Sequence, residues 1–261
     1  MQSENIITSY KTKLKENGFL DIDLNELYPN IFQEFRKTIS EELLLSRLNR
    51  IHVDSMIDSK HDINFIKDII KETIPGEYQL EQTQLRDTQG KPQQKLEFSP
   101  SFTKVGQVNL LTKLKNKIIK ISNQLFQSWI EGRFIPTSSE HILIRTLVNT
   151  ILEDFYDITS NPIGDLDNPF NITCFQENDL IVSHKDSDGA NFKCVVLLYL
   201  SDGYQEGFGG ELNLMGHYKV KPTFGKLVIL DFENHNIEHE VIKVNEDYFR
   251  LAITTFISND D

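Results

Sequence analysis

Two residues in the run LIVSHKD have side chains that together could bind a metal ion. His184 and Asp186 are separated by one residue in a run with the composition of a β-strand. Side chains two apart on a strand point to the same face, so one imidazole and one carboxylate could hold the same cation. An H-x-D triplet also arises often by chance, and alone it equally fits a solvated strand end.

A third metal ligand is available farther along the chain. His239 opens the strand-like run HEVIKV, whereas His235 lies earlier, in the turn-like stretch FENHN. We therefore favour His239 over His235 as the third ligand. Two histidines and one carboxylate make the facial triad of non-haem iron(II) oxygenases, which leaves coordination positions open for other molecules.

Arg250 could hold an anionic molecule beside such a metal. It lies in FRLAITTFI, the strand-like run that follows His239. A fixed guanidinium binds a carboxylate through two parallel hydrogen bonds. Arg250 and Thr254 share one face of this run, so the Thr254 hydroxyl could donate a hydrogen bond beside the guanidinium. The alternative is a structural ion pair between Arg250 and one of the many acidic groups.

The C-terminal part of the chain has the sequence pattern of a β-protein. After Asn161, seven short β-rich runs are separated by Gly, Asn, Asp and Pro: NITCFQE, LIVSHKD, FKCVVLLYL, GELNLM, KLVILDF, HEVIKV and YFRLAITTFI. Short strands separated by such turn-forming residues predict a β-sandwich or a β-barrel.

The N-terminal part shows mainly helical periodicity. Apolar residues predict a helix that ends at Gly18, a short strand in GFLDID, and helices over 25–49. Spacings of three and four predict a further helix from about Val108 to Trp129, and another that Ser138 or Ser139 caps and that runs to Phe155. The polar stretch RDTQGKPQQ predicts a surface loop.

Five motifs occur in the order typical of a known family. They are SHKD, VVLLYL, GGEL, HEV and FRLAITTF, all between Phe170 and Ile257. In this order they resemble the prolyl-4-hydroxylase group of 2-oxoglutarate oxygenases, over roughly the last third of the chain. The resemblance implies an α+β fold, with a double-stranded β-helix (jelly roll) as catalytic core over residues 165–261. A mainly helical region, 1–164, would pack on this core as one structural unit and shape the substrate pocket.

The resemblance also implies roles for individual residues. The iron ligands would be His184, Asp186 and His239. Arg250 would bind the distal carboxylate of 2-oxoglutarate, helped by Thr254 and Tyr199. The cofactor would be Fe(II) and the co-substrates 2-oxoglutarate and O₂, with ascorbate as a supporting reductant. The family often has a tyrosine where this sequence has Phe175; Thr173 or Asn171, on the same strand face, are candidates to replace its contact.

Three hypotheses about function stay open at this point. The first is an enzyme that hydroxylates an unactivated C–H bond of a small, amino-acid-like metabolite, since the H-K-D triplet resembles bacterial amino-acid hydroxylases. The alternative is a hydroxylase of prolyl or other residues in a peptide or protein. The third is a non-catalytic, cupin-like binding protein. Asp186 favours hydroxylation, because halogenating relatives lack this carboxylate.

The composition of the chain limits the classes of partner and the cellular compartment that we expect. The chain has 261 residues, 39% of them hydrophobic, and a net charge of -12. A protein this acidic repels phosphate backbones and anionic lipids, so we expect neither nucleic acid nor a membrane as partner. Cys174 and Cys194 do not form a zinc motif, and we expect two buried, reduced thiols. The first residues lack the apolar core of a signal peptide, so we expect a cytoplasmic protein.

Overall fold

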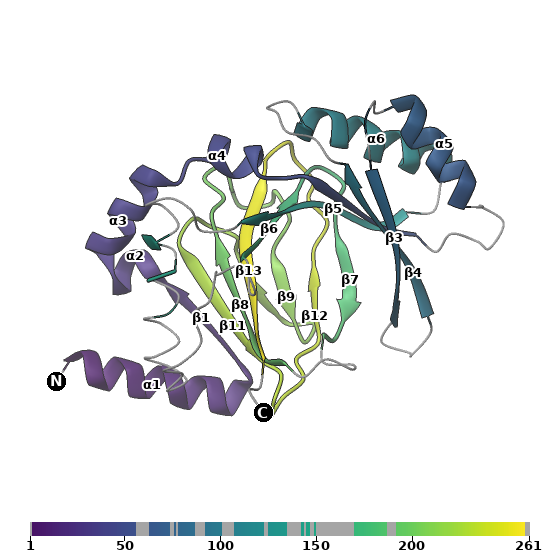
Figure 1. The fold of residues 1–261 in the computed structure, drawn as a ribbon. Coiled ribbons are helices and arrows are strands. Elements are labelled where there is room, and N and C mark those ends of the chain that lie inside the picture. Colours follow the sequence, from purple (N-terminus) through teal and green to yellow (C-terminus); the bar gives the residue numbers. More distant parts are fainter. Residues whose placement is uncertain are drawn as a thin grey trace.

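The structure is a computed structural model that describes residues 2–55, 63–73, 76, 78–86, 92–100, 107–122, 125–134, 142–143, 145–146, 149, 170–186 and 192–258. Two antiparallel β-sheets face each other in it (Figure 1). The strands of the large sheet are β1 (Phe19–Asp23), β2 (Arg50–Ser55), β3 (Tyr78–Arg86), β4 (Pro92–Pro100), β5 (Leu125–Phe134), β6 (Phe170–Phe175), β8 (Phe192–Tyr199), β11 (Lys226–Asp231) and β13 (Arg250–Ser258). Those of the small sheet are β7 (Ile181–His184), β9 (Leu212–Leu214), β10 (Tyr218–Val220) and β12 (His239–Val241).

The strand order is that of a jelly roll with an extended sheet. Among the described residues, the large sheet runs β1-β11-β8-β13-β6-β5-β2-β4-β3 and the small sheet β10-β9-β12-β7. Each of the seven β-rich runs expected after Asn161 contains a strand, and β10 is an additional one. The double-stranded β-helix expected for the C-terminal part is therefore confirmed.

Helices from the N-terminal part cover the outer face of the large sheet. They are α1 (Gln2–Asn17), α2 (Leu24–Leu27), α3 (Pro29–Thr38), α4 (Glu41–Ser46), α5 (Ile63–Thr73) and α6 (Gln107–Ser122). Figure 1 shows α1 to α4 on one side of the molecule and α5 and α6 near β3 and β4. Phe32 of α3 and Leu114 of α6 belong to one buried core with Ile253 of β13. Helical stripes thus pack on the sheet, as expected from their periodicity.

A second core fills the space between the two sheets. Phe175, Val228 and Ala252 of the large sheet belong to this core, together with Leu214 and Val241 of the small one. Neighbouring residues on a strand point to opposite faces, so each central strand of the large sheet supplies both cores. This inner space is where the chemistry-bearing residues lie.

Three local expectations need correction or fall outside the described residues. The helix expected up to Trp129 ends at Ser122, and Leu125–Phe134 is strand β5, because pairing with β6 and β2 outweighs the helical spacing. The loop expected over 86–94 is shorter, because Arg86 ends β3 and pairs with Pro92 at the start of β4. The helix expected up to Phe155 lies mostly outside the described residues.

The N-terminal part is more than a helical cover. It supplies strands β1 to β5, of which the sequence analysis expected only β1. β1 pairs with β11 at one edge of the jelly-roll sheet, and β5 pairs with β6 and joins β2, β4 and β3 to it. Strands from both parts therefore build one continuous sheet.

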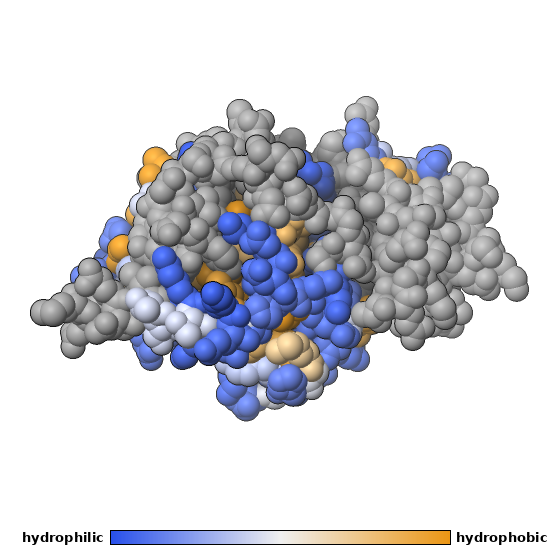
Figure 2. All heavy atoms as spheres, turned by 90° about the horizontal axis from the view of Figure 1, so that it is seen from below, coloured by the Kyte–Doolittle hydropathy of each residue, from blue (hydrophilic) through white to orange (hydrophobic). Residues whose placement is uncertain are grey.

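The surface of the described residues offers few apolar side chains. Seen from below, the described area is mainly hydrophilic (Figure 2). The exposed large hydrophobic residues of the described chain are scattered: Ile31, Ile142, Met215 and Tyr218. None of the described helices combines the length and apolar composition needed to cross a membrane.

Candidate metal centre and co-substrate pocket

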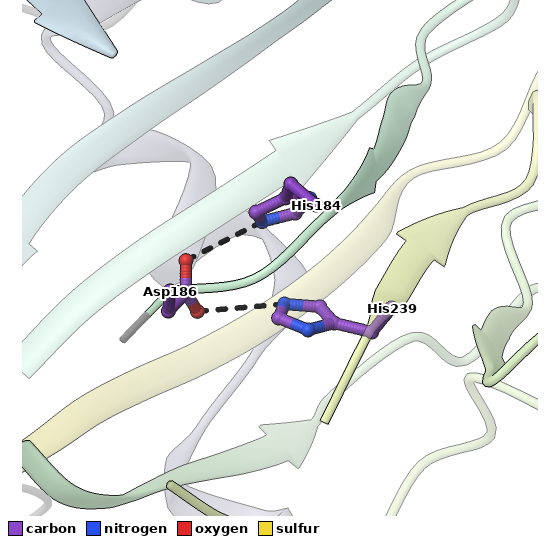
Figure 3. A group of neighbouring side chains, drawn as sticks. All are labelled: His184, Asp186 and His239. Carbon is purple, nitrogen blue, oxygen red and sulfur yellow. Dashed lines mark ion pairs between the residues drawn. The ribbon is translucent and has the colours of Figure 1, made fainter. Parts of the chain in front are cut away.

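His184 and His239 face each other across one strand pair of the small sheet. β7 ends at His184, β12 begins at His239, and the two residues are direct partners in the antiparallel register. Their ring centroids lie 4.3 Å apart. Asp186 follows β7 closely, and Figure 3 shows its carboxylate directed at both rings. The fold thus brings together three residues that are up to 55 positions apart in the sequence.

The atoms of these three side chains converge as metal ligands do. Oδ1 of Asp186 lies 3.4 Å from Nε2 of His184, and Oδ2 lies 3.4 Å from Nε2 of His239. The ligand atoms all lie within 4.8 Å of one another. Nitrogen and oxygen ligands at about 2.0–2.2 Å from one ion are roughly 3 Å apart, so a metal fits here with small side-chain movements.

Backbone carbonyls fix the orientation of both imidazoles. Nδ1 of His184 lies 2.9 Å from the carbonyl oxygen of Val182, and Nδ1 of His239 lies 3.0 Å from that of Ile237. A carbonyl oxygen only accepts hydrogen bonds, so each Nδ1 carries the proton and donates it. The lone pair is then on Nε2, the atom that faces Asp186. Metal-binding histidines are held in this way in proteins.

Asp186 is ionised at neutral pH. Burial raises the pKa of this carboxyl, but its interactions with His184 and His239 lower it by more, and the pKa ends well below its usual range. The side chains of His184 and Asp186 are each 25% exposed, whereas that of His239 is 9% exposed. The centre therefore combines an anionic ligand with access from one side.

Arg250 is a buried cation on the inner face of the large sheet. Its side chain is fully enclosed, with 1% of the residue exposed. Nε donates to the carbonyl oxygen of Gly210 at 2.5 Å, and Nη2 donates to the Tyr199 hydroxyl at 3.0 Å. Among the described residues, no carboxylate forms an ion pair with Arg250. A buried charge is costly without a partner, so this guanidinium suits the carboxylate of a bound molecule.

Two aromatic rings enclose the Arg250 guanidinium. Its central carbon lies 4.7 Å from the centre of the Phe175 ring and 4.9 Å from that of Tyr199. Burial raises the pKa of Tyr199 although Arg250 lowers it in part, so the phenol stays neutral. Phe175 has no hydroxyl, but its ring stacks against the cation and keeps water away from it.

The glycine pair of GGEL shapes this pocket from another side. Gly210 has a φ of +81°, and a Cβ there would lie 2.5 Å from the Tyr248 hydroxyl and 2.9 Å from Cδ of Arg250. The Tyr248 hydroxyl donates to the carbonyl oxygen of Gly209 at 2.6 Å. The two glycine carbonyls thus accept hydrogen bonds from Tyr248 and Arg250. The sequence analysis named GGEL only as a motif and did not predict this role.

Thr254 lies farther from the guanidinium than Tyr199 does. It shares the inner face of β13 with Arg250, but it pairs with Leu197 of β8 and Asn171 of β6. Four residues along a strand span roughly 13 Å. Tyr199 is therefore the predicted helper that contacts Arg250, while Thr254 lies toward the other end of the strand.

A buried ion pair fixes the start of the strand that ends in His184. Nζ of Lys115 in α6 lies 2.7 Å from Oδ2 of Asp179, which precedes β7. Ser128 of β5 donates to Oδ1 of Asp179 at 2.6 Å. The backbone N–H of Gln176 donates to Oδ2 at 2.8 Å. Sequence reasoning missed this pair, because its partners are 64 residues apart and no motif marks them.

His235, the rival ligand, has another partner. Its Nδ1 lies 2.9 Å from Oδ2 of Asp231, and it is not part of the group formed by His184, Asp186 and His239. His217 is exposed and also lies outside this group. The structure therefore brings His239, and not His235, to the other two predicted ligands.

With this geometry established, comparisons with known proteins identify the C-terminal part. Residues 170–258 match the family model described as "2OG-Fe(II) oxygenase superfamily". This range contains all three converging side chains and Arg250. Residues 170–258 are a 2OG-Fe(II) oxygenase domain. The superfamily implies Fe(II), 2-oxoglutarate and O₂, and the matched residues support a 2-oxoglutarate-dependent oxygenase.

One solved structure agrees with this fold. A prolyl-4-hydroxylase from Pseudomonas putida superposes with a TM-score of 0.54 at 11% identity, over 97% of this chain and 100% of that one. A Trichoplax adhaerens prolyl hydroxylase, in complex with a hypoxia inducible factor peptide fragment, gives 0.49 at 16% identity, over 98% and 90%. At such identities, the first likeness shows the fold. No match was found among curated proteins.

Proposed function

We propose that this oxygenase hydroxylates an unactivated C–H bond of a small, amino-acid-like metabolite. In this proposal His184, Asp186 and His239 hold Fe(II), which when bound activates O₂ while 2-oxoglutarate is oxidised to succinate and CO₂. The observation that carries the proposal is the convergence of these three side chains on one point, with both Nε2 lone pairs directed there. A carboxylate in the triad leaves no place for a halide, which supports hydroxylation.

Arg250 and Tyr199 anchor the co-substrate in the proposal. The guanidinium of Arg250 would bind the far carboxylate of 2-oxoglutarate, because it is buried without a carboxylate partner among the described residues. The rings of Phe175 and Tyr199 would exclude water from this ion pair and so strengthen it. Thr254, on the same face, would contact 2-oxoglutarate at a point farther from Arg250.

A small polar substrate suits the rest of the inner face. Next to β13, strand β6 presents Asn171 and Thr173, and β5 presents Glu131 and Arg133. Such side chains bind the charged groups of an amino acid better than they bind an apolar chain. The alternative substrate is a prolyl residue in a peptide. The experiment must distinguish this substrate from a free amino acid.

The test is a panel of free amino acids and proline-containing peptides. Each is incubated with the protein, Fe(II), ascorbate and 2-oxoglutarate in air, and products are detected by the mass of one added oxygen atom. We expect a free amino acid to be hydroxylated, and Asp186→Ala to abolish the reaction. Hydroxylation of peptides only would overturn the substrate class. Metal and ligand binding without any succinate release would instead indicate a binding protein.

The two cysteines bear on the location of the enzyme. Cys174 and Cys194 are buried and unbridged. Burial, and to a lesser extent Asp179, raise the pKa of the Cys174 thiol far above its usual value. Two inert thiols of this kind fit a reducing compartment, and we propose the cytoplasm.

A further inference from the structure

We infer that Arg133 binds the carboxylate of the substrate, on the side of the metal centre away from 2-oxoglutarate. The inference rests on the proposed function and narrows its substrate class to compounds with a free carboxylate. An internal residue of a peptide has no such group, so Arg133 would also decide between the two substrate classes.

The register of three neighbouring strands places Arg133 on the inner face of the large sheet. Arg133 of β5 pairs with Asn171 of β6, and Asn171 pairs with Thr254 of β13. Ile130 of β5 and Ile172 of β6 belong to the core under the helices. Because side chains alternate, Arg133 and Asn171 belong to the opposite, inner face. They form one row across the sheet with Thr254.

The row of Arg133, Asn171 and Thr254 lies about as far from the turn between β6 and β7 as His184 does. After Phe175 the chain turns, with Asp179 N–H bonded to the Gln176 carbonyl at 2.9 Å, and returns as β7 in the other sheet. His184 lies three residues beyond Ile181, the start of β7, and Asn171 lies four residues before Phe175. At about 3.3 Å per residue, both are therefore roughly 10–13 Å from the turn. The row that ends in Arg133 is level with the metal centre.

Arg133 lies on the far side of β6 from Arg250. In the proposed function, 2-oxoglutarate would lie against β13 and β8, the strands of Arg250 and Tyr199, which are hydrogen-bonded to each other. In the sheet order β5 is two strands beyond β13, roughly 10 Å away, and it contacts β7. A substrate must reach the metal without displacing 2-oxoglutarate, so the space beside β5 and β6 is left for it. Arg133 is the cation that β5 presents there.

The positive charge of Arg133 has no partner among the described residues. Arg133 is exposed and forms no ion pair or hydrogen bond with any described residue, although the chain carries 39 acidic residues. Glu131, on the same face, is engaged instead: its Oε1 accepts from Nε1 of Trp129 at 3.3 Å and also contacts His52. The Asn171 side chain, half-buried beside Arg133, adds hydrogen-bond donors for the same carboxylate. An exposed guanidinium beside an amide donor is a suitable carboxylate site.

The experiment compares each free amino acid with its own carboxamide. The two differ only in the charge of the group that Arg133 would bind. They are offered to the wild type, to Arg133→Gln and to Arg133→Lys, with saturating Fe(II) and 2-oxoglutarate. Lys219→Gln is the control, because Lys219 is an exposed cation on β10, at the opposite edge of the small sheet from β7.

We expect the wild type to hydroxylate a free amino acid and to prefer it to its carboxamide by roughly tenfold or more, the effect of one charge-assisted pair. Arg133→Gln should raise KM for the free acid by a similar factor and leave KM for the carboxamide nearly unchanged. Arg133→Lys should recover part of the loss, and Lys219→Gln should behave as the wild type.

A second readout does not need turnover. With Mn(II) in place of iron and 2-oxoglutarate present, the fluorescence of Trp129, the single tryptophan, should report amino-acid binding. Equal use of acid and carboxamide, an unchanged KM in Arg133→Gln, or no binding of free amino acids would each overturn the inference. If the wild type releases no succinate with Fe(II), the proposed function itself fails.

Discussion

His184 and His239 are opposed residues of one antiparallel strand pair, so a single register sets the separation of two candidate metal ligands. The orientation of each ring is fixed by a hydrogen bond from its Nδ1 to the carbonyl oxygen two residues earlier in the chain. The pairing shifts between His239 and Val241, which is a local irregularity next to the ligand. Strand pairing and two backbone carbonyls therefore fix both imidazoles of the candidate metal centre.

Replacing His239 tests the choice of ligand. His239→Ala should weaken Mn(II) binding by more than about 100-fold, because loss of a ligand costs more than loss of an outer partner, which costs about 10–100-fold. His235→Ala should leave the affinity unchanged, since His235 pairs with Asp231 outside the group. Free Mn(II) can be followed by electron paramagnetic resonance. The reverse result would make His235 the ligand.

Adding a methyl group at Gly210 tests the pocket wall. Gly210→Ala should displace Arg250 and raise KM for 2-oxoglutarate by roughly tenfold, since the new Cβ would meet Cδ of Arg250 and the Tyr248 hydroxyl. Gly207→Ala is a matched control, because Gly207 also has a positive φ, +90°, but a Cβ there meets nothing within 4 Å. Similar kinetics for both variants would show that only backbone strain, and not the wall, matters.

Changing Arg250 tests the anchor directly. Arg250→Lys keeps the positive charge but loses the paired N–H donors of the guanidinium, so this variant should bind 2-oxoglutarate poorly. Arg250→Ala should raise the apparent KM for 2-oxoglutarate by roughly tenfold or more and change metal affinity much less. Trp129 gives a binding signal, because its ring stacks at 6.1 Å from Phe175, which covers Arg250. Unaltered 2-oxoglutarate binding in Arg250→Ala would place the anchor elsewhere.

The buried pair below β7 should matter for stability. Lys115→Met leaves Asp179 as an unpaired charge, and loss of one partner of a buried pair costs about 3–5 kcal/mol. Lys117→Met, on the same helix, breaks an exposed pair with Glu72 and should cost at most about 1 kcal/mol. Urea unfolding measures both. Equal midpoints for the two variants would mean that the Lys115–Asp179 pair does not stabilise the fold.

The sequence predicted the parts of the fold that local patterns encode. The seven C-terminal β-rich runs and the helix stop at Gly18 follow from alternation and from turn residues. The side chains expected at the site, His184, Asp186 and His239, also converge, because the strand periodicity and the motif order carry that information.

Other features depend on contacts between distant segments, which no local pattern reveals. Trp129 fitted a helical stripe by its spacing, yet pairing with β2 and β6 makes its segment a strand. Strands β2 to β4 carry few apolar residues, so they were not expected. The Gly210 carbonyl that accepts a hydrogen bond from Arg250 lies 40 residues away in the sequence, and this contact required the fold.

Succinate release is the most direct test of the central claim, that His184, Asp186 and His239 form the iron centre of a 2-oxoglutarate oxygenase. Succinate is measured after incubation of the wild type and of Asp186→Ala with 2-oxoglutarate, in the presence and absence of Fe(II) and O₂. The account predicts succinate only for the wild type with both Fe(II) and O₂, and none for Asp186→Ala of intact fold. Equal succinate from both proteins, or none from the iron-loaded wild type with its amino-acid panel, would contradict it.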